Sequence, residues 1–411
     1  MFTSILVLLQ LVTGGKIKKI RNISIIGGAG RVGLPLALVL SQCEFNVWSI
    51  DIDKIAIEKI SKKEMPFLEI GAQKILDENL GKTFHVTDDF NTLNNSEVIF
   101  IVLGTELDQY QQPNSTNFVN SIVELLPFFA EEKIIILRST IAPGLYRKVE
   151  EIIREVYPKI IMGYCPERIL EGNALEELRK LPQVIGVRSD LEFATIEKIF
   201  TRLGVKTIKS TPEEAELVKL FTNTWRYAKF AIANEFWKIS NEFDLDYNKI
   251  REIITLDYPR ANDLPKAGFT AGPCLYKDTV QLYSVLSSSF SLGFQAININ
   301  ENLPLYLIEK ISNIYNLNDL NVGLLGLTFK ANSDDVRNSL SLKLLERLKL
   351  LSKTVKAFDP YIDNNLTILK EILENSDLII IGTPHDDFKN LIFNCPVIDI
   401  WGSIKRSAKI E

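Results

Sequence analysis

Histidine is almost absent from this chain, whose 411 residues include two, His85 and His385. A histidine-rich metal site or a histidine-based catalytic triad is therefore disfavoured. The four cysteines lie far apart and form no Cys-x-x-Cys pair, which argues against structural zinc, so we expect no bound metal. We expect these thiols to stay reduced, as in the cytoplasm.

An excess of positive charge is lacking as well. The net charge is −5, the pI is close to 5.5, and no long basic run occurs. We therefore expect no nucleic-acid partner. A small anionic substrate would need a local cluster of lysine and arginine side chains instead.

No apolar run is long enough to suggest a membrane span. The first 15 residues are apolar, but they are too short to cross a bilayer as a helix. They also lack the charged segment and cleavage site of a signal peptide. We interpret 1–20 as an N-terminal extension, with a surface helix or a start-site extension favoured over a membrane anchor.

The rest of the chain has the composition of a globular protein long enough for two or three domains. Short runs of Ile, Val and Leu alternate with helical stretches, which predicts a parallel sheet buried on both faces. The expected strands are Ile23–Ile26, Asn46–Ile50, Val98–Leu103, Lys133–Leu137, Ile160–Tyr164 and Val184–Val187.

A long helix should follow this first series. Thr211 can serve as N-cap, Pro212 fits the first helical position, and Glu214 completes a capping box. Apolar residues then recur at helical spacing to about Ile239, as suits a domain connection or a dimer interface. A second series of strands is expected at Val322–Leu327, Thr354–Phe358, Leu378–Ile381 and Val397–Ile400.

These patterns predict an α/β fold in three parts. An N-terminal Rossmann-like domain should cover 21–208, and a central region with the long helix should cover 209–305. A second Rossmann-like domain should cover 306–411.

A glycine motif follows the first expected strand. Gly28-Ala29-Gly30-Arg31-Val32-Gly33 fits G-x-G-x-x-G, whose glycines permit a tight turn and close approach to a pyrophosphate. Asp51, at the end of the second strand, would bind both ribose hydroxyls and repel a 2′-phosphate, which favours NAD over NADP. A purely structural turn and a flavin site are the alternatives.

Polar side chains form a stripe on the long helix. Lys219 and Asn223 lie one turn apart, and Asn234 falls three turns beyond Asn223. Beside an apolar face, this stripe suggests contact with a polar ligand. The alternative is a solvated helix edge.

Further candidates follow the later strands, where open parallel sheets bind ligands. Thr140 ends one strand, and Glu167 and Arg168 follow the next. Glu167 suits a general base or, alternatively, a helix cap. Arg260 and Lys330 suit phosphate or carboxylate oxygens, or exposed salt bridges.

A cysteine stands in a segment that we expect to be a turn. Gly272-Pro273-Cys274 is followed by Lys277 and Asp278, three and four residues beyond the thiol. A thiol so placed can attack an aldehyde while the charged groups handle protons. Taken alone, the cysteine fits a buried core thiol at least as well.

Taken together and in order, these segments resemble the UDP-glucose/GDP-mannose dehydrogenase family from about Arg21 to Trp401. The matching stretches are GGAGRVGLPLA, RSTIAPG, CPERILEGNALEEL, EAELVKLFTNTWR, ANEF, GPCLYKD and VGLLGLTFKANSDDVRNS. The resemblance implies a four-electron oxidation of a nucleotide sugar at C6, with two NAD and one water consumed.

The resemblance also implies residue roles. Lys219, Asn223 and Asp278 would deprotonate the C6 hydroxyl through a water, and Cys274 would carry a thiohemiacetal and then a thioester. Water oriented near Thr140 and Glu167 would release the uronate. The implied cofactor-binding residues are those of the glycine motif together with Asp51, Thr105 and Thr140. The implied substrate-binding residues are Glu167, Arg168, Lys219, Asn223, Arg260, Gly272, Lys330 and Arg337, and the long helix would build a homodimer.

The motifs leave the sugar open. After the cysteine, Lys277-Asp278 resembles the branches acting on UDP-glucose or GDP-mannose, whereas Gly272-Pro273 before it matches neither branch. CPER and PRAN look more like the N-acetylhexosamine branch. The leading hypothesis is a cytoplasmic, NAD-dependent UDP-sugar 6-dehydrogenase that makes a uronic acid for surface polysaccharide. The alternatives are a two-electron β-hydroxyacid-type dehydrogenase and a catalytically idle protein that binds NAD and a nucleotide sugar.

Overall fold

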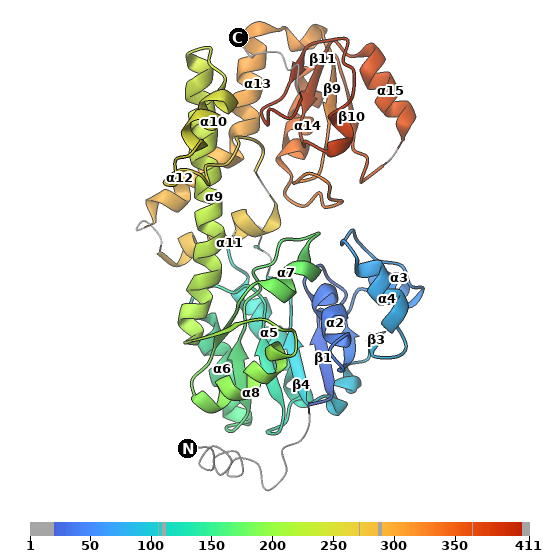
Figure 1. Ribbon diagram of the computed structural model, residues 1–411, viewed down its shortest axis with the longest axis vertical. Helices are drawn as coiled ribbons and strands as arrows, with labels where there is room; N and C mark the ends of the chain where they lie inside the picture. The colour runs from blue at the N-terminus through green and yellow to red at the C-terminus, as the bar shows by residue number, and fades with distance from the viewer. Residues whose placement is uncertain are drawn as a thin grey trace. The chain divides into compact units, whose positions relative to one another are not determined.

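The computed structural model describes residues 20–105, 107–108, 112–270, 272–286, 290–363 and 365–404. The chain divides into two compact units (Figure 1). The first comprises the residues up to Thr105 together with Ser115–Glu216, and the second comprises Glu106–Asn114 and the residues from Leu217 onward. The expected extension 1–20 lies, except for its last residue, outside the described part. Within that part, no helix is long and apolar enough to cross a membrane.

The first unit is built on one sheet of eight strands with the order β3-β2-β1-β4-β5-β6-β7-β8. The strands are β1 (Asn22–Ile26), β2 (Asn46–Ile50), β3 (Phe84–Thr87), β4 (Val98–Ile101), β5 (Ile134–Leu137), β6 (Ile161–Tyr164), β7 (Gln183–Gly186) and β8 (Thr207–Ser210). All six predicted strands are confirmed within three residues, but β3 and β8 were not predicted. The expected all-parallel order is wrong at one place, because β6 and β7 pair antiparallel.

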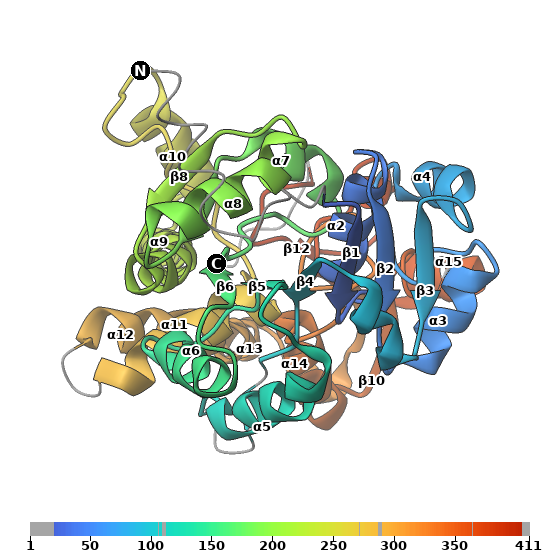
Figure 2. The same cartoon turned by 90° about the horizontal axis from the view of Figure 1, so that it is seen from below.

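Helices cover both faces of this sheet. They are α2 (Gly33–Ser41), α3 (Lys54–Ser61), α4 (Ala72–Asn79), α5 (Ser115–Leu125), α6 (Leu145–Val156), α7 (Ala174–Lys180) and α8 (Asp190–Thr201). Helix α2 packs beside α4 and α7, whereas α5 packs beside α6. Figure 2 shows α5 and α6 on one side of the strands and α7 and α8 on the other. The apolar runs of β1, β4 and β5 are buried between these layers, as the sequence predicted.

Helix α9 (Pro212–Glu242) is the predicted long helix. The backbone N–H of Thr211 donates to Glu214 Oε2 at 2.8 Å, and the N–H of Glu214 donates to Thr211 Oγ1 at 3.2 Å. This reciprocal pair confirms the capping box.

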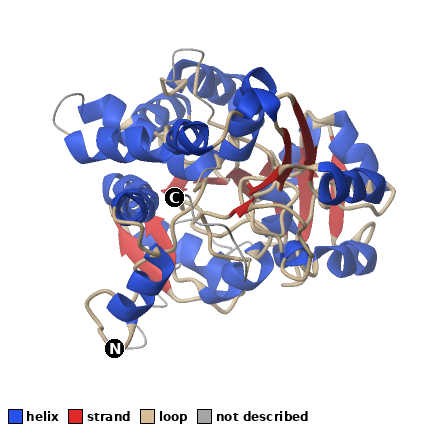
Figure 3. Ribbon diagram, turned by 90° about the horizontal axis from the view of Figure 1, so that it is seen from above, coloured by secondary structure: helices blue, strands red, loops and turns tan. Residues whose placement is uncertain are grey.

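The second unit contains a parallel sheet of four strands in the order β10-β9-β11-β12. They are β9 (Asn321–Leu325), β10 (Thr354–Phe358), β11 (Leu378–Ile381) and β12 (Val397–Ile398), so the second predicted series is confirmed. The helices are α10 (Tyr247–Thr255), α11 (Pro273–Leu286), α12 (Ser291–Glu301), α13 (Leu303–Ile314), α14 (Leu340–Leu351) and α15 (Leu366–Asn375). Figure 3 shows the strands lying among the helices.

Alternating side chains of β9 enter two different cores. Leu324 packs in one core with Leu344 and Leu348 of α14, whereas Leu325 packs in another with Ile372 of α15. The sheet is thus covered on both faces, and the carboxyl ends of its strands remain the place for polar loops.

A buried amide pair joins α9 to the segment that precedes the cysteine. Asn234 is fully buried; its Nδ2 donates to Asn300 Oδ1 at 2.9 Å, and its Oδ1 accepts the N–H of Gly268 at 2.9 Å. Gly268 has φ +153°, and a Cβ there would lie 2.5 Å from Cδ2 of Trp401. Asn234 therefore meets protein partners, and the interpretation of this residue as part of a ligand-contacting stripe is wrong.

The amide pair predicts a stability effect. Asn234→Ala should lower the free energy of unfolding by about 2–3 kcal/mol, because it leaves the Gly268 N–H and the Asn300 amide buried without this partner. Urea denaturation would measure the change. Asn298→Ala, on the exposed face of α12, is the control and should cost at most about 0.5 kcal/mol. Equal values for the two variants would contradict the role given to the pair.

Candidate active site

The glycine turn between β1 and α2 has two kinds of glycine. A Cβ on Gly28 would lie 2.7 Å from the carbonyl oxygen of Ile25, and one on Gly33 would lie 2.8 Å from Cα of Gly28. These two glycines are required by the packing of the protein itself. At Gly30, the nearest atom to a Cβ would be 3.5 Å away, so its missing side chain leaves open space above the turn. That space fits the close approach of a pyrophosphate.

Asp51 lies directly after β2 and faces this turn. Its Oδ2 accepts the N–H of Ala29 at 2.9 Å, and its Oδ1 accepts the N–H groups of Ile52 and Asp53 at 2.8 and 3.1 Å. The carboxylate is partly exposed and is held in one orientation. The turn and the acid therefore fit the predicted dinucleotide, with a negative charge where a 2′-phosphate would stand.

The other residues of the motif shape its edges. Val32 is the N-cap residue of α2, and the guanidinium of Arg31 lies 5.0 Å from the ring centroid of Phe67. Farther along the sheet, the hydroxyl of Thr105 donates to the carbonyl of Thr140, which brings the ends of β4 and β5 together. The cofactor contacts of these side chains stay predictions.

Glu167 is held by protein groups at both carboxylate oxygens. Its Oε2 forms an ion pair with Arg138, and its Oε1 accepts the N–H groups of Arg168 and Ile169 at 2.7 and 3.0 Å. The two N–H groups belong to a loop, and the next helix, α7, begins only at Ala174, so the helix-cap alternative for Glu167 is wrong. A role as general base stays a prediction, and it would require this carboxylate to change partners.

Arg138 is a residue that the sequence reasoning did not single out. It is 1% exposed, and its Nη1 donates to the carbonyl of Cys165 at 3.0 Å and to Gln183 Oε1 at 2.8 Å. Arg138 thereby ties the loops after β5 and β6 together beside Glu167. Its place at the end of the apolar run of β5 was the available signal. Arg168, in turn, donates to the carbonyl of Pro182.

In the second unit, three predicted polar residues come together. The Nδ2 of Asn223 donates to Asp278 Oδ2 at 2.6 Å, and Lys219 Nζ lies 3.9 Å from the same oxygen. Lys219, Asn223 and Asp278 are 7%, 5% and 1% exposed, so the solvated-edge interpretation is wrong. A buried lysine beside a buried carboxylate is a frequent arrangement in functional sites.

One oxygen of Asp278 is left over. Oδ1 is buried and has no hydrogen-bond partner among the described residues. A buried carboxylate oxygen without a donor is costly, so a water or a ligand hydroxyl is the natural partner. Together with Asn223 and Lys219, Asp278 can therefore hold a hydroxyl and take up its proton.

Cys274 lies in the first turn of α11, so the expectation of an irregular turn at the cysteine is wrong. Its side chain is exposed, whereas Asp278, four residues later on the same helix, is buried. The N-terminus of a helix stabilises negative charge, which suits a thiolate at this position. The expected alternative of a buried core thiol at Cys274 is likewise wrong.

The other three cysteines are less suited to nucleophilic chemistry. Burial raises the pKa of Cys165 to about 12, and burial also raises the pKa values of Cys43 and Cys395 above their usual value. Because the thiolate is the reactive form, these shifts favour Cys274 as the nucleophile.

Gly272 fits its place for two reasons. Its φ of +101° is unfavourable for other residues, and a Cβ would lie 2.5 Å from Cδ2 of the Phe329 ring. The segment before Cys274 is thus packed against the loop that follows β9.

The predicted basic residues of this unit have different surroundings. The guanidinium of Arg337 pairs with Asp335, with Nη2 2.6 Å from Oδ2, and its side chain is half-exposed. The carbonyl of Lys330 accepts from the hydroxyl of Thr328 at 2.9 Å. Arg260 is exposed; its Nε donates to the hydroxyl of Tyr258 at 2.9 Å. Substrate contacts of all three basic residues stay predictions.

The chain matches three models of the UDP-glucose/GDP-mannose dehydrogenase family. These describe the NAD binding domain at residues 21–204, the central domain at 213–302 and the UDP binding domain at 323–406.

The similar proteins include UDP-N-acetyl-D-mannosamine dehydrogenases and UDP-glucose 6-dehydrogenases. The former enzyme from Methanocaldococcus jannaschii is 30% identical over 380 residues, which cover 88% of this chain and 86% of that protein. The UDP-glucose 6-dehydrogenase of Rickettsia bellii is 27% identical over 421 residues, covering 95% and 97%. The solved UDP-N-acetyl-D-mannosamine dehydrogenase of Pyrococcus horikoshii superimposes with a TM-score of 0.86 at 27% identity, covering 94% of this chain and 96% of that one.

The two kinds of glycine predict two phenotypes. Gly30→Ala should fold normally but weaken NAD binding by at least about tenfold, because the methyl group enters the open space that the pyrophosphate needs. Gly33→Ala should instead lower the melting temperature, since its Cβ would overlap backbone atoms of Gly28. Fluorescence titration with NAD and thermal unfolding separate the two results. Unchanged NAD affinity in folded Gly30→Ala would contradict this assignment.

Proposed function

This chain belongs to the UDP-glucose/GDP-mannose dehydrogenase family, and from its site we propose that it oxidises the C6 hydroxyl of a UDP-sugar to a carboxylate with NAD. The observation that carries the proposal is in the second unit. An exposed cysteine lies in the first turn of α11, and the next turn carries Asp278, a buried carboxylate with one oxygen unpartnered among the described residues. NAD, when bound, accepts the hydride that leaves carbon 6 in each oxidation.

The first oxidation needs a group that takes the proton of the C6 hydroxyl. Asp278 can accept it at Oδ1, directly or through a water, while Asn223 holds Oδ2 at 2.6 Å. Lys219 adds a positive charge near the developing alkoxide and steadies the carboxylate from 3.9 Å. The product of this step is an aldehyde.

The second oxidation needs a covalent intermediate. The thiolate of Cys274 adds to the aldehyde carbon and gives a thiohemiacetal, which loses a second hydride and a proton to become a thioester. Water then attacks the thioester carbon, the C–S bond breaks, and the thiol leaves with the uronate formed. We assign the orientation of this water to Thr140 and Glu167, as the family resemblance implies.

The nucleotide would be held by basic side chains. Lys330 and Arg337 follow β9, within the segment that matches the family's UDP binding domain. We assign Arg168, Arg260 and the backbone of Gly272 to the same substrate. Charge-assisted contacts of this kind would compensate for the overall acidity of the chain.

Among UDP-sugars we place UDP-N-acetylmannosamine first and UDP-glucose second. Both names occur among the similar proteins, and the former belongs to relatives of 29 and 30% identity. The uronic acid formed would be a precursor of surface polysaccharide. We place the reaction in the cytoplasm, where thiols such as Cys274 stay reduced.

A two-electron dehydrogenase of the β-hydroxyacid type, the main alternative, would need no nucleophilic cysteine. It also gives no reason for the match to a UDP binding domain at residues 323–406.

We also propose a homodimer formed through α9. Exposed apolar residues recur along one stripe of this helix and its end, namely Phe221, Trp225, Ile232, Phe236, Ile239 and Phe243. The Trp225 side chain lies on this stripe and is 60% exposed. A continuous apolar stripe of this length on a helix suits association with an identical copy.

Product stoichiometry tests the reaction. The wild-type protein should form two NADH for each UDP-N-acetylmannosamine or UDP-glucose oxidised, and a panel of UDP- and GDP-sugars identifies the substrate. Cys274→Ser should lower uronate formation by at least about 10³-fold, because the covalent nucleophile is lost. Cys43→Ser is the matched control and should behave like the wild type. One NADH per sugar with a stable aldehyde, or full turnover by Cys274→Ser, would exclude the four-electron scheme.

Light scattering after size exclusion tests the dimer. Trp225→Glu should convert a dimeric wild type into a monomer, because a charge placed in an apolar interface is not compensated. Leu350→Glu, at an exposed leucine of α14, should leave the mass unchanged. A monomeric wild type, or a Trp225→Glu variant that remains dimeric, would refute the interface.

A further inference from the structure

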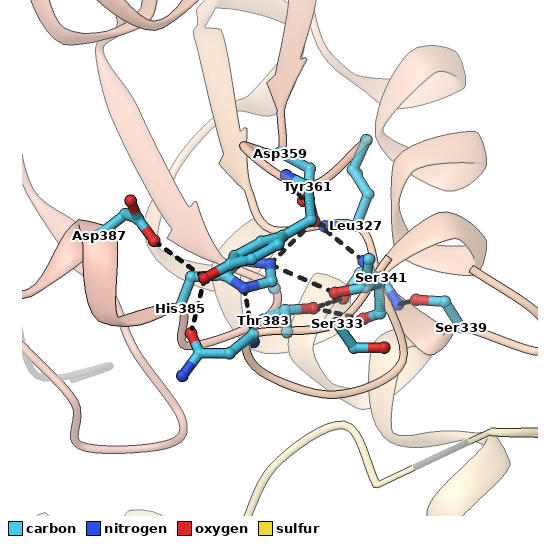
Figure 4. A network of polar contacts seen from close by, with 12 residues as sticks. Leu327, Ser333, Ser339, Ser341, Asp359, Tyr361, Thr383, His385 and Asp387 are labelled. Atoms are coloured by element: carbon cyan, nitrogen blue, oxygen red, sulfur yellow. Dashed lines mark hydrogen bonds and ion pairs between the residues drawn. The ribbon is translucent and has the colours of Figure 1, made fainter. Parts of the chain in front are cut away.

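A buried acid–histidine pair lies at the carboxyl ends of the strands of the second sheet (Figure 4). Asp359 directly follows β10, and His385 lies four residues after β11. The two residues are 2% and 0% exposed, and Asp359 Oδ2 lies 2.9 Å from His385 Nε2. None of the roles assigned above uses either residue.

The pair forms hydrogen bonds with the backbone of the loop that follows β9. Asp359 Oδ2 accepts the N–H groups of Leu327 and Thr328 at 2.6 and 3.1 Å. His385 Nδ1 accepts the N–H of Asn332 at 2.9 Å, which places the proton of the neutral ring on Nε2, toward Asp359. The loop 327–332 is thus fixed at both ends.

Between these ends, threonine hydroxyl groups donate hydrogen bonds to backbone carbonyls of the loop. The hydroxyl of Thr383 donates to the carbonyl of Thr328 at 2.5 Å, and the hydroxyl of Thr328 donates to the carbonyl of Lys330 at 2.9 Å. Burial alone would raise the pKa of Asp359, but the hydrogen bond from His385 and those from the backbone N–H groups of Leu327 and Tyr361 bring this pKa below its usual value. Asp359 is therefore an anion held by several donors.

In the first unit, Asp51 occupies the position that corresponds to Asp359. Asp51 follows β2, which pairs with β1 as β10 pairs with β9. Asp51 is partly exposed, and its carboxylate accepts hydrogen bonds from the backbone N–H groups of Ala29, Ile52 and Asp53. In the second unit the corresponding carboxylate, Asp359, is buried against a histidine. It is suited to holding a loop and unsuited to binding a ribose.

The loop so held carries two groups next to the reaction. Phe329 packs its ring against Gly272, two residues before Cys274. Lys330 is the next residue, in the segment that matches a UDP binding domain. The position of loop 327–332 therefore bears on both the nucleotide and the cysteine segment.

We propose that Asp359 and His385 form a positioning dyad that holds loop 327–332, so that Lys330 meets the diphosphate and Phe329 supports the segment before Cys274. The role of Lys330 rests on the proposed function, whereas the hold on the loop does not.

Two substitutions of His385 divide its contacts. His385→Asn keeps an acceptor near Nδ1 for the N–H of Asn332, whereas His385→Gln keeps a donor toward Asp359 and loses that acceptor. His385→Gln should weaken binding of UDP by about tenfold in calorimetry and raise KM for the UDP-sugar more than it lowers kcat. In His385→Asn, the UDP affinity and the KM for the UDP-sugar should lie closer to the wild-type values than they do in His385→Gln. NAD affinity should stay within about twofold in both, because NAD binds in the first unit.

The chain's other histidine is a matched control. His85 stacks on Trp48 in the first unit, and His85→Gln should leave the UDP affinity unchanged. UDP affinity and KM within twofold of wild type in folded His385→Gln would overturn the proposal. Parallel losses of UDP and NAD affinity would overturn it too, because the effect would then not be confined to the loop.

Hydrogen exchange separates the dyad from the proposed function. His385→Gln should raise the exchange rate of the Asn332 amide by at least about tenfold without any ligand, and leave the amides of the turn at Gly28–Gly33 unchanged. This result can hold even if no UDP-sugar is oxidised, in which case only the proposed function fails. An unchanged Asn332 amide would refute the dyad whatever the activity.

Discussion

The hydrogen bond between Asn223 and Asp278 is the interaction on which the proposed site depends. It joins α9 to α11 at 2.6 Å in a buried environment, and it leaves Lys219 beside the same oxygen. Because Asp278 and Cys274 are one helical turn apart on α11, the contact that fixes the carboxylate also fixes the direction of the helix start that bears the thiol. A buried carboxylate without these partners would be strongly destabilised.

Each unit also contains a loop whose backbone is held by an aspartate. Asp51 and Asp359 occupy corresponding places at the ends of β2 and β10, and each accepts at least one backbone N–H from the turn after the neighbouring strand. The first turn keeps open space at Gly30, and the second is closed by His385. The same strand pairing thus supports a dinucleotide turn in one unit and a rigid loop in the other.

Local periodicity predicted the buried strands and the long helix, and helical spacing placed Lys219 and Asn223 on one face of that helix. That these two residues act together with Asp278 was implied by the family resemblance. The sequence missed the two edge strands: β8, whose Thr207–Ser210 segment is polar and half-exposed, and β3, in which only Phe84 is fully buried. It also placed Cys274 in a turn, because a Gly-Pro pair is typical of turns. Proline is equally suited to the first position of a helix, and Pro273 is the first residue of α11. Arg138 and the Asp359–His385 pair were not predicted, because no motif linked them to their partners, and their burial and contacts arise only in the fold.

The central claim is that Cys274 carries the acyl group of the sugar between the second oxidation and hydrolysis. Rapid acid quenching during turnover with NAD and the UDP-sugar, followed by peptide mass spectrometry, tests it most directly. We predict a thioester adduct on the peptide that contains Cys274, which disappears once the sugar is exhausted. Two NADH per sugar without any adduct on that peptide, or with an adduct on Cys43, Cys165 or Cys395, would contradict the account.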